Sequence, residues 1–138
     1  MTAYCLDTSY LLRLLTQTPD SQVPSALEFY HESSRAKNTL SVSDLVLSEC
    51  YYALQYHFDY SKVDALASLR ALANDESIQV TPAASEVLQL RNLSKLKPGF
   101  IDRIIHSDGH SKNQTLVTFE KAAKKLPDTL ILSAKNSK

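Results

Sequence analysis

The sequence predicts an α/β domain with a parallel sheet covered by helices on both faces. Short apolar segments, the first of them Ala3-Tyr4-Cys5-Leu6, alternate with longer segments whose apolar residues recur at helical spacing. No tight hairpin signal joins any two strands, and only two glycines and five prolines occur in 138 residues. A chain of this length forms one domain, which we assign to residues 1–134, with a polar tail over 135–138.

The first elements follow in order. The opening strand ends on Asp7-Thr8-Ser9, whose side-chain oxygens can cap a leucine-rich helix that Thr18-Pro19-Asp20 ends. An amphipathic helix over 25–35 then precedes a second strand over 39–42. Ser43-Asp44 begins the next helix, which we expect to continue to about Phe58.

The second half repeats this alternation. A helix from Ser61 to about Ala73 precedes a third strand, and Pro82 suits the first turn of the helix that follows, to about Leu93. Pro98-Gly99 ends that region. The third strand is predicted at 77–80. The elements predicted after Pro98-Gly99 are a helix at 101–110, a fourth strand at 115–118, a short helix at 119–125 and a fifth strand at 129–132.

Charge and hydropathy narrow the class of protein. The 15 Lys and Arg residues balance the 15 Asp and Glu, but residues 1–60 hold seven acids and three bases, whereas residues 61–138 hold eight acids and twelve bases. Asp7 and Arg13 interrupt any secretion signal, and no apolar run approaches the ~20 residues that span a bilayer. We therefore expect a cytoplasmic protein without membrane attachment, in which Cys5 and Cys50 are buried free thiols.

Four acids follow elements whose carboxyl ends meet at one edge of a parallel sheet. Asp7 and Glu120 come just after the first and fourth strands, Asp102 begins a helix, and Glu49 lies two turns into the helix after the second strand. Taken singly, Asp7 is a helix cap, and Asp102 and Glu120 are first-turn charges. Taken together, clustered carboxylates need a hard divalent cation, and magnesium activates water for phosphodiester cleavage. A metal-dependent nuclease is the chemistry this set favours.

These residues resemble the PIN domain family, and within it the small VapC-type toxins, over nearly the whole chain. Asp7-Thr8 before an apolar helix resembles the opening of the family, and Glu49 resembles the acid of its third helix. Asp102 and the Thr118-Phe119-Glu120 motif, eighteen residues apart from acid to acid, resemble its C-terminal pair. Glu120 stands where the family usually has Asp, a methylene longer.

The resemblance implies a three-layer fold with a five-stranded parallel sheet and an endoribonuclease site. Asp7, Glu49, Asp102 and Glu120 would hold magnesium or manganese, with Thr8 and Thr118 in support. The expected partners are an RNA substrate, an antitoxin protein and a second copy of the chain, since the third and fourth helices of this family commonly form a groove for an antitoxin or a dimer mate.

Two other functions compete with this interpretation. A catalytically impaired domain that binds RNA or a protein partner is favoured by Glu120 in place of Asp. A phosphoacceptor receiver domain is excluded because the third strand ends in Val80-Thr81, without an acid. His106 and His110 have the spacing of a two-histidine metal site, but no Glu or Cys accompanies them, and we expect His106 to be partly exposed.

Overall fold

The computed structural model describes residues 1–134, and the predicted polar tail at 135–138 lies outside the described residues. The helices are α1 (Thr8–Thr16), α2 (Val23–Arg35), α3 (Asp44–Tyr56), α4 (Lys62–Ala73), α5 (Pro82–Leu88) and α6 (Phe100–Ser111). The strands are β1 (Ala3–Cys5), β2 (Thr39–Ser41), β3 (Ile78–Gln79), β4 (Leu116–Thr118) and β5 (Thr129–Ile131). Two short 3-10 helices are η1 (Leu93–Lys95) and η2 (Lys121–Lys125). The alternation of strand and helix follows the prediction.

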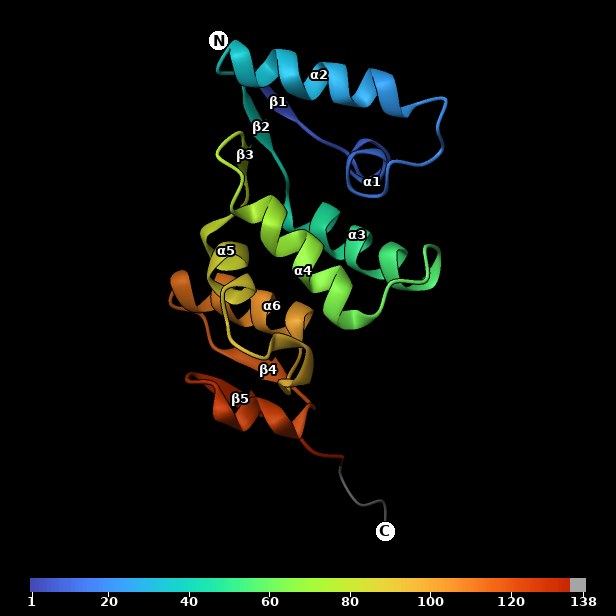
Figure 1. Cartoon of the computed structure of the whole chain (residues 1–138). Helices are drawn as coiled ribbons and strands as arrows, with labels where there is room; N and C mark the ends of the chain where they lie inside the picture. The colour runs from blue at the N-terminus through green and yellow to red at the C-terminus, as the bar shows by residue number, and fades with distance from the viewer. Residues whose placement is uncertain (135–138) are drawn as a thin grey trace.

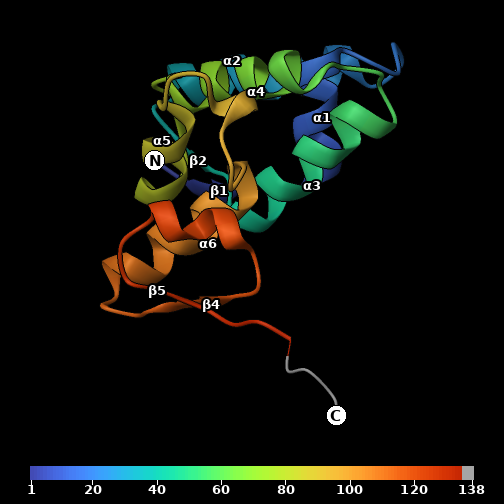
Figure 2. The same ribbon diagram turned by 90° about the horizontal axis from the view of Figure 1, so that it is seen from below.

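The strands form two sheets. β1, β2 and β3 pair in that order, β4 pairs with β5, and every pairing is parallel, as expected. The prediction of one five-stranded sheet is wrong. Helix α6 packs against α5 and places Phe100 and Ile104 in the core, and β4 then packs beside α6. In both views of the chain α6 lies between β1 and β4, which keeps the two sheets apart (Figures 1 and 2).

Short polar side chains start four of the helices at the expected places. Asp7, Ser43, Ser61 and Thr81 each have extended backbone and accept a hydrogen bond from a backbone N–H in the first turn of α1, α3, α4 and α5. The helix predicted from Pro82 to about Leu93 ends at Leu88, and the chain turns through left-handed Asn92 into η1. The helix predicted at 119–125 is the shorter 3-10 helix η2.

The core lies between the three-stranded sheet and the helices from α1 to α6. Leucines and one cysteine make up its most completely buried side chains: Leu11, Leu40, Leu47, Leu54, Leu69, Leu88 and Cys50. Cys50 is buried as predicted, whereas Cys5 is exposed. β1 is an edge strand of the three-stranded sheet, and all three of its residues are exposed. Among residues 1–134, no helix is long and apolar enough to cross a membrane.

Candidate active site

The start of α1 and the middle of α3 bring Asp7 and Glu49 to one region, and we call these two the N-terminal pair. Helices α1 and α3 pack together, and the Thr8 hydroxyl donates a hydrogen bond of 3.0 Å to Oε1 of Glu49. Both carboxylates are exposed. Thr8, predicted to support the site, therefore fixes the orientation of the Glu49 side chain. Because Thr8 follows Asp7 directly, this bond holds Glu49 near Asp7.

Asp7 is held in its ionised form. Its Oδ1 accepts hydrogen bonds from the Tyr10 backbone N–H at 2.8 Å and from the Ser9 hydroxyl at 2.9 Å. These two bonds, with a smaller contribution from the charge of Arg13, lower the pKa of Asp7 below its ordinary value. Since both bonds use Oδ1, Oδ2 is left for another ligand. The Ser9 contact was not predicted as part of the site, although the Asp-x-Ser spacing at a helix cap was visible in the sequence.

The buried thiol of Cys50 lies behind the N-terminal pair. Desolvation raises its pKa to about 12, and the negative charges of Glu49 and Asp7 add to the shift. Both carboxylates therefore act on one buried sulfur, which supports their closeness. A thiol with this pKa is not a nucleophile at neutral pH, so Cys50 is a packing residue.

Asp102 and Glu120, the C-terminal pair, line one small pocket between α6 and β4. This pocket has a volume of about 170 Å³, and Thr118 is also part of its wall. The Glu120 backbone N–H donates to the Thr118 hydroxyl at 3.0 Å, and Oε1 of Glu120 accepts from the Ala122 N–H at 3.0 Å. Thr118 thus holds the turn that carries Glu120, while Oε2 of Glu120 and the exposed Asp102 carboxylate face solvent.

The two pairs remain separate in this structure. Among residues 1–134, no group of three or more His, Cys, Asp or Glu side chains lies close enough together to hold one metal ion. The donor set nevertheless fits a hard divalent cation, because the four carboxylates are exposed and Asp7 and Glu120 each keep one oxygen free. Each pair can supply two carboxylate oxygens, and water can complete the coordination of magnesium or manganese.

An exposed apolar stripe on α3 surrounds Glu49. Leu45 is 70%, Tyr52 48% and Tyr56 72% exposed, and the two tyrosine rings stack with centroids 6.2 Å apart. Side chains of this size and exposure are typical of an interaction surface. Leu45, Tyr52 and Tyr56 lie at helical spacing from Glu49 and share its face of α3, and the structure shows that this face is exposed to solvent.

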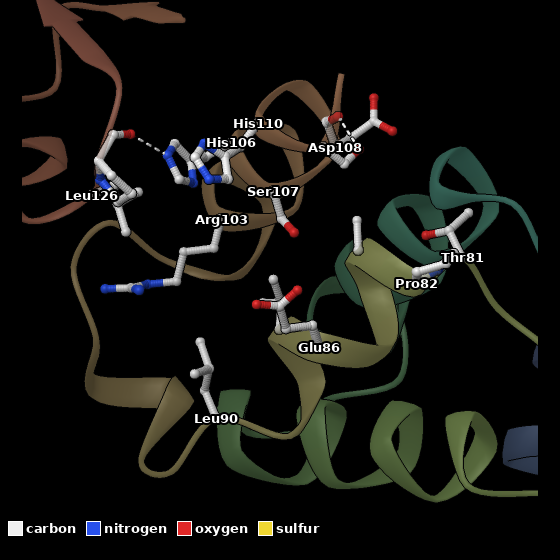
Figure 3. Close-up of a pocket in the computed structure, with 14 residues that line it drawn as sticks. Thr81, Pro82, Glu86, Leu90, Arg103, His106, Ser107, Asp108, His110 and Leu126 are labelled. Atoms are coloured by element: carbon white, nitrogen blue, oxygen red, sulfur yellow. Dashed lines mark hydrogen bonds between the residues drawn. The ribbon is translucent and has the colours of Figure 1, made fainter. Parts of the chain in front are cut away.

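The His106 and His110 pair belongs to another part of the molecule. Figure 3 shows both rings on α6 beside a pocket of about 490 Å³ that α5 also lines, and none of the four acids lies on its wall. His106 is 8% exposed, which corrects the prediction of partial exposure, and its Nε2 lies 2.6 Å from the Pro127 carbonyl. His110 pairs with Asp128 at 3.0 Å. Both histidines fasten the turn before β5 to α6.

Comparison with known proteins identifies the family to which this chain belongs. The PIN domain family model matches residues 4–128. Among solved structures, the crystal structure of VapBC2 from Rickettsia felis bound to a DNA fragment from their promoter matches 95% of this chain and 98% of that chain, with 21% sequence identity and a TM-score of 0.42. No curated protein matches the chain at a significant level. Because the family model covers nearly the whole sequence, the chain belongs to the PIN domain family.

Proposed function

We propose that the protein is a metal-dependent endoribonuclease that acts as the toxin of a type II toxin–antitoxin pair. The observation that carries the proposal is the set of four exposed carboxylates, with Glu49 held beside the start of α1 by the hydrogen bond from Thr8, the residue after Asp7. They occupy the acidic positions at which the sequence resembles VapC-type toxins. Membership of the PIN family supports a nuclease.

The four carboxylates would hold magnesium or manganese. A bound divalent ion stabilises charge on the phosphate and lowers the pKa of a coordinated water. The chain contributes the arrangement of the ligands: Asp7 is kept ionised by its hydrogen bonds, Thr8 orients Glu49, and Thr118 holds the turn that carries Glu120. The extra methylene of Glu120 reaches further than the usual Asp, which favours binding through water.

The basic η2 helix supports an RNA substrate. Glu120 caps this helix, which carries exposed lysines at 121, 124 and 125 directly after the acid. A phosphate that approaches the C-terminal pair would meet these ammonium groups, and such contacts supply affinity without sequence preference. The antitoxin would cover the exposed apolar stripe on α3 that surrounds Glu49, which would also block access to the N-terminal pair.

The test is cleavage of a fluorescently labelled single-stranded RNA with manganese, with EDTA and by Asp102→Asn. We expect the wild-type protein to cleave the RNA with manganese and not with EDTA, and we expect Asp102→Asn not to cleave it. EDTA and the loss of a carboxylate ligand both remove the ion. Asp108→Asn is the matched control, since Asp108 lies on the same helix and pairs with Lys112 at 3.1 Å. Undiminished cleavage in EDTA, or by the Asp102 variant, would contradict the proposed chemistry.

The impaired binding domain is the second candidate, favoured by Glu120 and by the separation of the two pairs. The thermal stability of the protein with and without manganese distinguishes this binding domain from the enzyme. A ligand at about 100 times its dissociation constant stabilises the fold by about 2.7 kcal/mol. Retained RNA binding with no manganese-induced thermal shift and no cleavage would favour the binding domain, whereas a thermal shift with cleavage supports the nuclease.

A further inference from the structure

A groove of about 710 Å³ opens between α1, α2 and β1. Figure 1 shows these three elements together at the top of the view. Asp7 lies in the wall of the groove, next to Ser9 and Arg13, which are four residues apart on one face of α1. Sites for small molecules have volumes of about 300–1,000 Å³. The groove therefore has the size of a ligand site and reaches one of the proposed metal ligands.

Aromatic rings of Tyr4, Tyr10 and Phe29 lie in the same wall. Phe29 packs edge to face on Tyr4, with centroids 5.1 Å apart, and on Tyr10, with centroids 5.6 Å apart. The Tyr10 hydroxyl donates to the Ala26 carbonyl at 2.9 Å, which fixes that ring. Tyr4 stays 38% exposed. An exposed ring held by neighbouring rings is suited to stack on the flat face of a nucleobase.

Arg13 brings a positive charge to the groove without an acidic partner. Its Nε donates to Oε1 of Gln22 at 2.5 Å, and its Nη1 donates to the Ser9 carbonyl at 3.4 Å. The ion pairs within residues 1–134 lie around the C-terminal end of α6 and do not include Arg13. An uncompensated guanidinium next to the proposed metal site is suited to bind a phosphate of the substrate.

Gln22 offers hydrogen-bond donors to a ligand. The nitrogens of arginine only donate, so the amide oxygen of Gln22 faces Arg13 and is engaged there. The amide N–H groups of Gln22 have no partner within residues 1–134, and they need an acceptor. The Ser25 hydroxyl, also in the wall, can donate or accept and does not discriminate.

This arrangement of donors distinguishes among the bases. Guanine and uracil present a carbonyl oxygen where adenine and cytosine present an amino group. An amide N–H pairs with the carbonyl oxygen and is left unpaired beside an amino group, which costs binding free energy. The groove therefore fits a guanine or uracil nucleotide, whose ring, keto oxygen and phosphate match the aromatic wall, the Gln22 amide and the Arg13 guanidinium.

We propose that the groove between α1 and α2 is a nucleotide subsite, which holds a guanine or uracil residue of the substrate next to the cleaved phosphodiester bond. The base stacks on Tyr4, its keto oxygen accepts from Gln22, and its phosphate contacts Arg13. The role as a substrate subsite rests on the proposed nuclease function, whereas the binding of a nucleotide does not.

NMR titration with nucleoside monophosphates tests the subsite without using activity. EDTA is present, so that no ion gathers phosphate at the carboxylates. We expect millimolar guanosine monophosphate to shift the signals of the Gln22 side-chain amide and of the α1 and α2 backbone. Adenosine monophosphate, the matched purine, should bind at least about fivefold more weakly. Equal affinity for the two would overturn the proposed base preference. No shift in the groove would overturn the subsite and leave the groove as a surface for a protein partner.

Two substitutions separate stacking from base recognition. Tyr4→Ala should weaken the binding of both nucleotides about fivefold or more, because stacking on the ring is lost. Gln22→Glu keeps an oxygen for Arg13 but replaces the amide donor by an acceptor, so the guanosine to adenosine affinity ratio should fall at least about fivefold. The controls are His31→Ala, an exposed ring elsewhere on α2, and Gln79→Glu, an exposed glutamine on β3. An unchanged affinity ratio in Gln22→Glu would contradict the role of its amide.

Sequencing the cut ends of a random-sequence RNA links the groove to cleavage. We expect wild-type protein to cut next to guanine or uracil, and Gln22→Glu to lose this preference. If wild type cleaves but Gln22→Glu cuts at the same sites, the substrate subsite is overturned and the nuclease proposal stands. If guanosine monophosphate binds in the groove but no RNA is cleaved, the nuclease proposal fails and the nucleotide site stands.

Discussion

Asp7 has two roles that substitution can separate, a helix cap and a proposed metal ligand. Its Oδ1 accepts the Tyr10 N–H at 2.8 Å, which satisfies one of the free donors at the start of α1. Asn offers an equivalent side-chain oxygen, whereas Ala offers none. We therefore expect Asp7→Asn to abolish RNA cleavage with little loss of stability. Asp7→Ala should abolish cleavage and also lower the stability of the fold.

The magnitude follows from the cap. Loss of an N-cap side chain costs about 1 kcal/mol. The Ser9 hydroxyl bond adds little, because both groups are exposed and water replaces the contact. For a domain of this size, 1 kcal/mol lowers the melting temperature by about 4 °C. The expected order of melting temperature is wild type, then Asp7→Asn, then Asp7→Ala, with the first two close together.

Circular dichroism melts and the RNA cleavage assay measure the two roles independently. Equal destabilisation by Asp7→Asn and Asp7→Ala would refute the capping role of Asp7. Full cleavage by Asp7→Asn would refute its role as a metal ligand. The pH dependence of stability gives a further check on the role of Asp7.

The folded-state pKa of Asp7 is lowered, so its ionised form contributes stability above the unfolded pKa. This contribution is lost as the pH falls through the folded-state pKa. The advantage of wild type over Asp7→Ala should therefore shrink in acid.

Three other predictions concern the core, the thiols and the fourth acid. Leu54→Ala empties a fully buried site on α3 and should lower the free energy of unfolding in urea by about 2–5 kcal/mol, whereas Leu45→Ala, 70% exposed on the same helix, should change it by less than about 0.5 kcal/mol. A maleimide at pH 7 should label Cys5 in the folded protein, and Cys50 only in denaturant, because burial raises the pKa of Cys50 to about 12; two labels without denaturant would contradict this. Glu120→Asp should lower the manganese concentration for half-maximal cleavage, since the shorter side chain restores the residue usual at this position; an increase would show that the longer reach is required.

Local features of the fold could be predicted because their causes are local. The caps at Ser43 and Ser61 depend on side chains within three residues of the N–H groups they satisfy. The burial of Cys50 follows from apolar neighbours at helical spacing. The exposure of Cys5 could not be predicted, because the burial of a strand's side chains depends on which distant segments cover its faces.

The candidate site shows the same division. The sequence identified the acids by their order and spacing, and the structure links Thr8, the residue after Asp7, to Glu49 across 41 residues. It did not predict that Asp102, which lies on α6, would be placed apart from Asp7 and Glu49, because the position of α6 is set by the packing of Phe100 and Ile104 in the core. Likewise, His106 was predicted to be partly exposed because its partner, the Pro127 carbonyl, lies 21 residues further on.

By itself the sequence determined the helices and their caps, the parallel direction of the strands, the acidic residues and the resemblance to the PIN family. All of these depend on residue type and short-range spacing. Only the tertiary structure decided how the strands divide into two sheets, which apolar faces stay bare and how the four carboxylates are grouped. These outcomes depend on a competition among surfaces far apart in the chain: α6 packs against α5 and β4, and Phe100 at the start of α6 contacts Tyr51 of α3.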